Sequence, residues 1–281
     1  MSEVATTSLG DRVAFDRRGA FGHGGPYSDA AHAAGAYDRG AAPAVVFVAG
    51  AGPWREIDRE TTSTAELLQA RGVASIVYDR LGRGESPAEG PITLDREVAA
   101  LAALVESAGG DAVLCGHSSG CSIALYAATH GVPVAGFALW EAPLAPPDSG
   151  AREWAAEIGR LLDHGALDGA LAAYMKDMPP EILEAVRSIP AMVTQAGSLR
   201  PDAESLAWAE SAPLADLCAG IRVPVLAMVG EETYEIMDSA AELIAAAIPG
   251  AERKRLPGAQ HGWKPEPMAA ELAAFVSRIR H

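Results

Sequence analysis

Short apolar runs alternate along the chain with segments whose apolar residues recur at helical spacing. A short apolar run that ends at a glycine or a polar residue is typical of a buried strand in a parallel sheet. Runs of this kind occupy residues 44–50, 73–79, 112–116, 134–140 and 223–230. Residues 94–110, between two of them, show the helical pattern. This alternation predicts an α/β fold with a mostly parallel central sheet flanked by helices on both faces.

Local signals mark where some of the helices begin and end. Ser63 and Glu66 are spaced as in a capping box, and Gly72 is placed to close the helix that follows. Thr93 is a suitable N-cap for the helical pattern that starts at Leu94. The sequence therefore predicts one helix that starts near Ser63 and another that starts at Leu94.

One long segment interrupts the alternation of strands and helices. Residues 143–221 have the pattern of helices and turns, and we interpret them as a helical lid inserted into a core formed by residues 1–142 and 222–281. The lid segment carries several aromatic and methionine side chains: Trp154, Tyr174, Met175, Met178, Met192 and Trp208. Packing of the lid helices is the favoured role of these side chains, and lining of a substrate site is the alternative.

The segment before the first apolar run has neither pattern. Residues 20–42 are rich in glycine and alanine and lack periodicity, which predicts a flexible surface loop. His23 and His32 lie in this loop, nine positions apart and without a neighbouring cysteine, so we expect solvated side chains rather than metal ligands. We predict no metal and no cofactor.

Composition and charge limit the class of protein. Hydrophobic residues make up 49% and charged residues 21% of the 281 residues, as in globular domains. The formal net charge of -15 argues against nucleic acid as a partner. The three cysteines form no CxxC pair, the N-terminus lacks a signal-peptide pattern, and no apolar run could span a bilayer. We therefore expect a cytoplasmic protein without a membrane partner; the oligomeric state is left open.

The stretch Gly116-His117-Ser118-Ser119-Gly120 has the pattern G-x-S-x-G between a predicted strand and a predicted helix. A sharp turn at this place would push the central serine above the sheet, and glycines allow the close approach of strand and helix. Ser118 is therefore the candidate nucleophile. The amide of Ser119 would lie at the helix N-terminus, where unpaired donors stabilise an anion.

The neighbouring nucleophiles have other predicted roles. Cys115 lies inside the strand and is expected to be a small apolar filler, whereas Cys121 would lie behind the turn. His117 is expected near the lid or the entrance to the site. A serine hydroxyl needs a base, and His261, in a glycine-bounded loop after a short predicted strand, is the best candidate.

Two further stretches, together with this serine turn, carry a resemblance to a known family. "YDRLGRGES" (78–86) resembles the D-x-x-G-x-G-x-S loop of α/β-hydrolases, and "VFVAGAGPW" (46–54) resembles their oxyanion loop. The chain is thus similar to α/β-hydrolase fold proteins over residues 40–280. The histidine of the family's oxyanion motif is Ala49 here, so the resemblance implies that Gly50 or Ala51 supplies the second oxyanion amide beside Ser119.

The triad acid departs from the usual family pattern. The family generally places an aspartate where this chain has Thr233, and Glu231, Glu232 or Asp238 could serve only in a shifted loop. We favour Glu141, which follows an apolar strand; zearalenone lactone hydrolases are similar in placing the triad glutamate there. A carboxylate at this place would be partly desolvated, and pairing with the base would offset that cost. A purely structural role for Glu141 is the alternative.

The resemblance implies a serine hydrolase that cleaves a small-molecule ester or lactone, with Trp54, His117 and Trp140 in its substrate pocket. Epoxide hydrolase and dehalogenase chemistry is disfavoured because position 118 is not aspartate. Other chemistry of the same triad is the alternative: hydrolysis of C–C bonds or thioesters, or a biosynthetic cyclisation or dehydration. A second alternative is a non-catalytic ligand-binding protein, because fold alone does not fix function.

Overall fold

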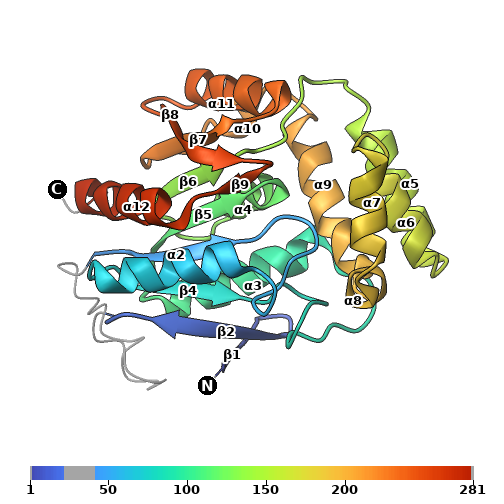
Figure 1. Ribbon diagram of the computed structural model, residues 1–281, viewed down its shortest axis with the longest axis horizontal. Helices are drawn as coiled ribbons and strands as arrows, with labels where there is room; N and C mark the ends of the chain where they lie inside the picture. Colours follow the sequence, from blue (N-terminus) through green and yellow to red (C-terminus); the bar gives the residue numbers. More distant parts are fainter. Residues whose placement is uncertain (1, 22–41, 280–281) are drawn as a thin grey trace.

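A nine-stranded sheet forms the centre of the computed structural model, which describes residues 2–21 and 42–279. The strand order is β1-β2-β4-β3-β5-β6-β7-β8-β9. The strands from β3 to β8 pair in parallel, and β1, β2 and β9 pair with their neighbours antiparallel (Figure 1). Their bounds are β1 Glu3–Thr6, β2 Arg12–Arg18, β3 Ala44–Val48, β4 Ser75–Tyr78, β5 Ala112–His117, β6 Gly136–Trp140, β7 Val225–Glu232, β8 Glu252–Ala259 and β9 Gly262–Trp263.

The mostly parallel α/β sheet predicted from the apolar runs is confirmed, and each of the five runs contains one of the strands β3 to β7. The predicted loop over residues 20–42 falls almost entirely outside the described residues, as do His23 and His32. The antiparallel strands β1 and β2 were not predicted. Strand β2 has charged side chains at Arg12, Asp16, Arg17 and Arg18. Its apolar centre is therefore too short to be recognised as an apolar run in the sequence.

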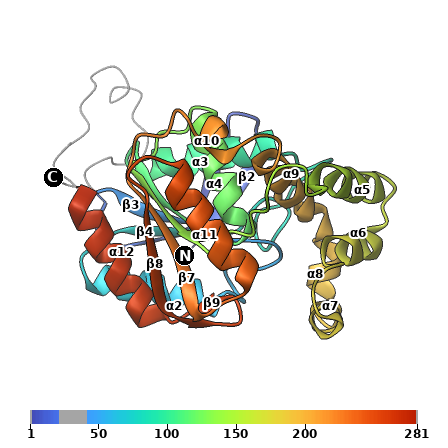
Figure 2. The same ribbon diagram turned by 90° about the horizontal axis from the view of Figure 1, so that it is seen from above.

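Helices cover both faces of the sheet, and alternate residues of each strand face one layer or the other. Val46 and Val48 of β3 belong to the apolar cluster beneath α3, α4 and α11, whereas Val45 and Phe47 belong to the cluster beneath α2 and α12 (Figure 2). Burial on both faces explains why the parallel strands are almost continuously apolar. These helices are α2 Arg59–Ala70, α3 Leu94–Ser107, α4 Ser119–Thr129, α11 Glu235–Ala247 and α12 Pro265–Ile279.

The predicted insertion over residues 143–221 folds as helices in two groups. Helices α5 to α8, here called the cap, stand to one side of the sheet (Figure 1), and their apolar side chains form a separate cluster together with residues of η1 and with Ala203 of α9. Helices α9 and α10 instead contribute Leu206, Ala209 and Leu214 to the main core. The helices are α5 Ala151–Asp163, α6 Leu167–Tyr174, α7 Pro180–Arg187, α8 Pro190–Thr194, the 3₁₀ helix η1 Ala196–Leu199, α9 Arg200–Ala209 and α10 Leu214–Leu217.

Packing within the cap accounts for some of its aromatic side chains. The rings of Trp154 and Tyr174 lie 5.1 Å apart, and the indole of Trp154 donates to the carbonyl of Ala173 at 2.8 Å. Met192 of α8 lies close to Gly52. A Cβ added to Gly52 would be 3.2 Å from the sulfur of Met192. The cap therefore touches the loop that follows β3.

The predicted capping box is wrong. Helix α2 begins four residues before Ser63, and Asp58 caps it by accepting a hydrogen bond from the amide of Thr61 at 3.0 Å. Helix α3 does begin at Leu94, but the hydroxyl of Thr93 makes no capping bond. A side chain of the insertion caps α3 instead, since Glu204 of α9 accepts from the amide of Leu94 at 2.9 Å. A local sequence pattern contains no information about this distant partner.

Two glycines allow α4 to close tightly onto the sheet. A Cβ at Gly120 would lie 2.1 Å from the carbonyl oxygen of Val48, and a Cβ at Gly116 would lie 2.7 Å from Cα of Cys121. No side chain fits at these distances without a backbone shift. The turn between them holds Ser118 at φ 55° and ψ -131°, a conformation that L residues rarely adopt.

We therefore expect Gly120→Ala to lower the free energy of unfolding by about 3 kcal/mol, because the new methyl group would push α4 away from β3. Urea unfolding followed by circular dichroism measures this change. Gly220→Ala is the matched control, since Gly220 is exposed and nothing lies within 4 Å of its added Cβ. Equal stability of the two variants would contradict the close packing of α4.

Candidate active site

Three predicted site residues lie at the ends of parallel strands of the sheet. Ser118 follows β5, Glu141 follows β6, and His261 lies in the turn between β8 and β9. Because parallel strands end at one edge of a sheet, these residues meet there. Backbone hydrogen bonds fix the edge: the amide of Ser118 donates to the carbonyl of Trp140 at 3.0 Å, and that of Glu141 to Met228 at 2.9 Å.

Glu141 and His261 are in direct contact. His261 Nδ1 lies 2.7 Å from Glu141 Oε2, and Glu141 Oε1 accepts the amide of Gly230 at 2.9 Å. The Glu141 side chain is 1% exposed. Burial raises the pKa of this carboxyl, but its contacts with His261, Thr233 and the Gly230 amide outweigh burial and hold the pKa below its ordinary value. Glu141 is therefore an anion at neutral pH.

The other candidate acids are not in contact with His261. Glu231 and Glu232 are exposed at the end of β7, and Asp238 pairs with Arg253 and Arg255. The hydroxyl of Thr233, at the position where the family usually has aspartate, is buried near Glu141 but makes no hydrogen bond of ordinary geometry. The structure thus pairs His261 with the glutamate that follows β6.

Two ring N–H groups hold the backbone of His261. Its carbonyl accepts from His117 Nε2 at 2.9 Å and from Trp140 Nε1 at 3.1 Å. His261 has φ 70°, and the preceding Gln260 has φ 52°. These donors stabilise a loop conformation that is otherwise unfavourable for residues with a side chain.

The three predicted pocket residues are buried or partly buried in the structure. Trp140 is fully buried and packs on Trp263 at 5.7 Å between ring centroids, behind the His261 loop. His117 lies against His261, with ring centroids 4.8 Å apart. Trp54 is also buried, and its carbonyl accepts two amides of the turn that leads into α2. Trp140 has no surface open to solvent, and the role of His117 and Trp54 in a substrate pocket stays a prediction.

His117 stays uncharged in this environment. Burial is the main cause, and the neighbouring His261 adds to it, so that the pKa of His117 falls to about 3. A neutral imidazole with its hydrogen on Nε2 is consistent with donation to the His261 carbonyl. His117 therefore adds no positive charge next to the candidate base.

The predicted oxyanion residues lie next to Ser118. A Cβ added to Gly50 would be 2.7 Å from Cβ and 3.5 Å from Oγ of Ser118, so this backbone passes directly over the serine. Ala51 packs against the cap. The side chain of Ser119 turns away from the site and donates to Asp202 at 2.7 Å, while its backbone belongs to the first turn of α4.

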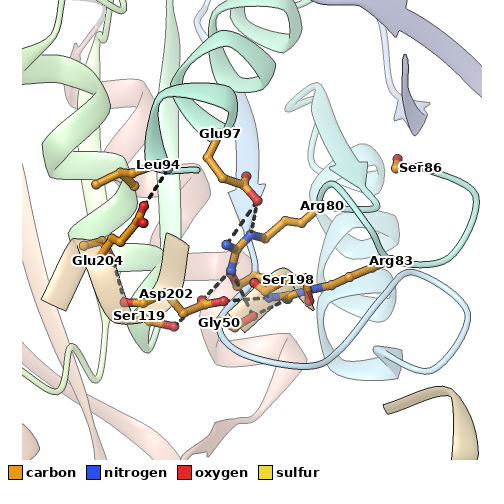
Figure 3. A network of polar contacts seen from close by, with 12 residues as sticks. Gly50, Arg80, Arg83, Ser86, Leu94, Glu97, Ser119, Ser198, Asp202 and Glu204 are labelled. Carbon is orange, nitrogen blue, oxygen red and sulfur yellow. Dashed lines mark hydrogen bonds and ion pairs between the residues drawn. The ribbon is translucent and has the colours of Figure 1, made fainter. Parts of the chain in front are cut away.

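A buried charge cluster adjoins this loop, and the sequence did not reveal it. Arg80, Arg83, Glu97 and Asp202 have side chains with no exposure to solvent (Figure 3). Burial, together with the positive charge of Arg80, lowers the pKa of Arg83 to about 10, so it remains a cation at neutral pH. The repeated arginines of "DRLGRGES" were the available signal, but Asp202 on α9 resembles any acidic residue of a helix.

The thiols near Ser118 are inert in this structure. Cys115 and Cys121 are buried, and burial raises the pKa of the Cys115 thiol to about 12 and that of Cys121 well above its ordinary value. Such thiols carry almost no reactive thiolate at neutral pH. Ser118 is half-buried and its Oγ makes no hydrogen bond to any described residue.

Among residues 2–21 and 42–279, no cluster of three or more histidine, cysteine, aspartate or glutamate side chains could hold a metal ion. Within the same residues, no helix has the length and apolar character needed to cross a bilayer.

Similar solved structures come from several bacteria. An α/β hydrolase from Sphaerobacter thermophilus is 27% identical, with a TM-score of 0.74 over 97% of this chain and 99% of that one. A thermophilic esterase from Thermogutta terrifontis is 21% identical, with a TM-score of 0.64 over 100% of both chains. An enol-lactonase from Burkholderia xenovorans is 19% identical, with a TM-score of 0.59 over 99% of this chain and 98% of that one.

A search of curated proteins finds no match to the chain. The model of the Alpha/beta hydrolase family matches residues 45–275, which include the serine turn, the oxyanion loop and His261. Sequence and fold agree over most of the length, and the chain belongs to the α/β-hydrolase family.

Proposed function

We propose that the protein is a serine hydrolase that cleaves a carboxylic ester or lactone through an acyl-enzyme on Ser118. The contact between Glu141 and His261 at 2.7 Å, on the sheet edge that also carries Ser118, is the observation that supports this most. An anionic carboxylate on Nδ1 keeps the hydrogen of a neutral imidazole on that nitrogen, so Nε2 is left to accept a proton.

Acylation begins when His261 Nε2 removes the hydroxyl proton of Ser118 and Oγ attacks the substrate carbonyl carbon. The carbonyl oxygen becomes an oxyanion, which the amides of Ser119 and of Ala51 or Gly50 stabilise. The C–O bond then breaks, and the leaving oxygen takes the proton from His261. Glu141 remains ionised throughout and stabilises the imidazolium between these two transfers.

Deacylation repeats these steps with water as the nucleophile. His261 removes a proton from water, the hydroxide attacks the acyl carbon, and a second oxyanion forms in the same place. Its collapse breaks the bond to Ser118 Oγ, which regains its proton from His261. A lactone follows the same route, except that the leaving alcohol stays attached to the acyl group.

The substrate class rests on similarity and on the surroundings of Ser118. Esterases and an enol-lactonase are among the solved structures with this fold. The contact of Met192 with Gly52 places cap side chains next to the oxyanion loop. We propose that residues 143–221 cover the substrate, and that residues 1–142 and 222–281 form the core that carries the triad.

A fluorophosphonate probe tests the nucleophile. We expect one site of labelling, at Ser118, with no labelling in Ser118→Ala and a rate at least about 10³-fold lower in His261→Ala. Tandem mass spectrometry of the labelled peptide identifies the residue. Labelling at another serine, or a rate that does not depend on His261, would contradict the proposed mechanism.

Two substitutions with the same loss of charge test the triad acid. Glu141→Gln should lower kcat for p-nitrophenyl butyrate by about 10³-fold or more, because the amide cannot stabilise the imidazolium. Glu232→Gln, at an exposed position on the next strand, should stay within about twofold of the unmodified protein. Equal losses, or a loss only at Glu232, would exclude Glu141 as the acid.

The pH profile tests the neutral state of His117. Because its pKa is lowered to about 3, His117 is neutral above about pH 5 and does not contribute to a rise of kcat/KM with pH. His117→Gln should therefore keep the midpoint of that rise within about 0.3 pH units. A midpoint shifted by about one unit would contradict the neutral state of His117.

A further inference from the structure

The cluster of four buried charges extends from the insertion to the oxyanion loop. Asp202 Oδ1 accepts from Arg80 at 2.5 Å, and Oδ2 accepts from Arg83 at 2.8 Å. Glu97 Oε1 accepts two further bonds from Arg80, both at 3.2 Å. The two cations and two anions cancel, and removal of one partner would leave an uncompensated charge out of contact with water.

Both arginines converge on the backbone of the oxyanion loop. Arg83 donates to the carbonyl of Gly50 at 2.5 Å, and Arg80 donates to the same carbonyl at 3.3 Å and to that of Ala49 at 3.1 Å. A peptide unit is planar and trans, so its N–H points away from its C=O. The arginines thus hold the Gly50–Ala51 peptide with the amide of Ala51 turned away from them.

The other half of the proposed oxyanion hole reaches the same carboxylate. Ser119 donates its hydroxyl to Asp202 Oδ1 at 2.7 Å, and its amide is the second proposed donor. One side chain of α9 therefore connects the residue that supplies one amide with the arginines that orient the other (Figure 3). Ser198 of η1 also accepts from Arg83 Nε, at 2.9 Å, so two elements of the insertion hold the arginines.

We propose that Asp202 is a positioning residue of the oxyanion hole, and that it couples the seating of α9 to the hydrolytic activity of Ser118. This inference rests on the proposed function. Asp202 touches no reacting atom. It acts through Arg80, Arg83 and Ser119, which fix the two amides before substrate binds, and such preorganisation lowers the cost of forming the oxyanion.

A matched pair of substitutions on α9 tests this role. Asp202 and Glu204 both reach from α9 to the core, but Glu204 only caps α3 through the amide of Leu94. In Asp202→Asn one of the two carboxylate oxygens becomes an NH2 group, a donor that faces an arginine donor or the Ser119 hydroxyl, and the negative charge between the arginines is lost. We expect Asp202→Asn to lower kcat for p-nitrophenyl butyrate about 100-fold, with KM within about twofold, whereas Glu204→Gln stays within about threefold.

A pair of inhibitors separates positioning from general damage. A trifluoromethyl ketone forms a serine adduct that carries an oxyanion, and the corresponding methyl ketone binds without one. For Asp202→Asn we expect the inhibition constant of the first to rise by about the same factor as kcat falls, and that of the second to change by less than about twofold. Equal weakening of both inhibitors, or a loss confined to KM, would overturn the proposal.

Milder variants keep the test decisive if Asp202→Asn does not fold, as judged by its thermal melt. Ser119→Ala and Ser122→Ala each remove one hydroxyl of α4 that bonds to α9. Ser122 bonds to Ser205 and to the carbonyl of Ser119, so its loss leaves the bonds of Asp202 to Ser119 and to the arginines in place. We expect kcat to fall about tenfold for Ser119→Ala and by less than about twofold for Ser122→Ala. Equal effects would overturn the proposal. Unmodified protein that neither reacts with the probe nor hydrolyses esters would instead refute the proposed function, and this proposal with it.

Discussion

The ion cluster of Arg80, Arg83, Glu97 and Asp202 joins more parts of this molecule than any other interaction described above. Its members come from the loop after β4, from α3 and from α9, and they bond to the loop after β3 and to the first residue of α4. Buried charges are costly unless every one is paired. The arrangement therefore tolerates few alternatives, and it fixes how the insertion, the serine turn and the oxyanion loop lie relative to one another.

Backbone strain gathers at the same edge of the sheet. The non-glycine residues with positive φ in the described parts of the chain are Ser118, Glu141, Asp148, Gln260 and His261. All except Asp148 lie in or beside the proposed triad. Unfavourable conformations persist only where the surroundings enforce them. Here three features stabilise these conformations: the parallel strands, the close packing of α4 on the sheet, and the two ring N–H groups that donate to the His261 carbonyl.

Much of this architecture was predictable because its signals are local. The apolar runs predicted β3 to β7, and the glycines around Ser118 predicted a sharp turn between a strand and a helix. The position of Glu141 directly after an apolar run marks it as a residue at the end of a strand, and the structure places it against His261. Its role as the triad acid stays a prediction.

The features that the sequence did not reveal depend on distant partners. The polar strands β1 and β2 owe their place to pairing at the edge of the sheet. The ring N–H groups of Trp140 and His117 bond to a carbonyl more than 100 positions away in the sequence. The role of Asp202 depends on its contacts with two arginines about 120 positions earlier in the sequence. The periodicity of apolar residues along the sequence does not predict such contacts, because they form only when separate elements pack together.

The most direct test of the account is to trap the acyl-enzyme. Rapid mixing with excess p-nitrophenyl butyrate, an acid quench and intact-mass spectrometry would measure the covalent intermediate together with the burst of p-nitrophenol. Acyl transfer to Ser118 predicts one butyryl group per molecule, located on the peptide that contains Ser118, and none in Ser118→Ala. Two results would contradict it. One is a full burst of p-nitrophenol with no covalent adduct in the same quenched sample, and the other is an adduct on another residue.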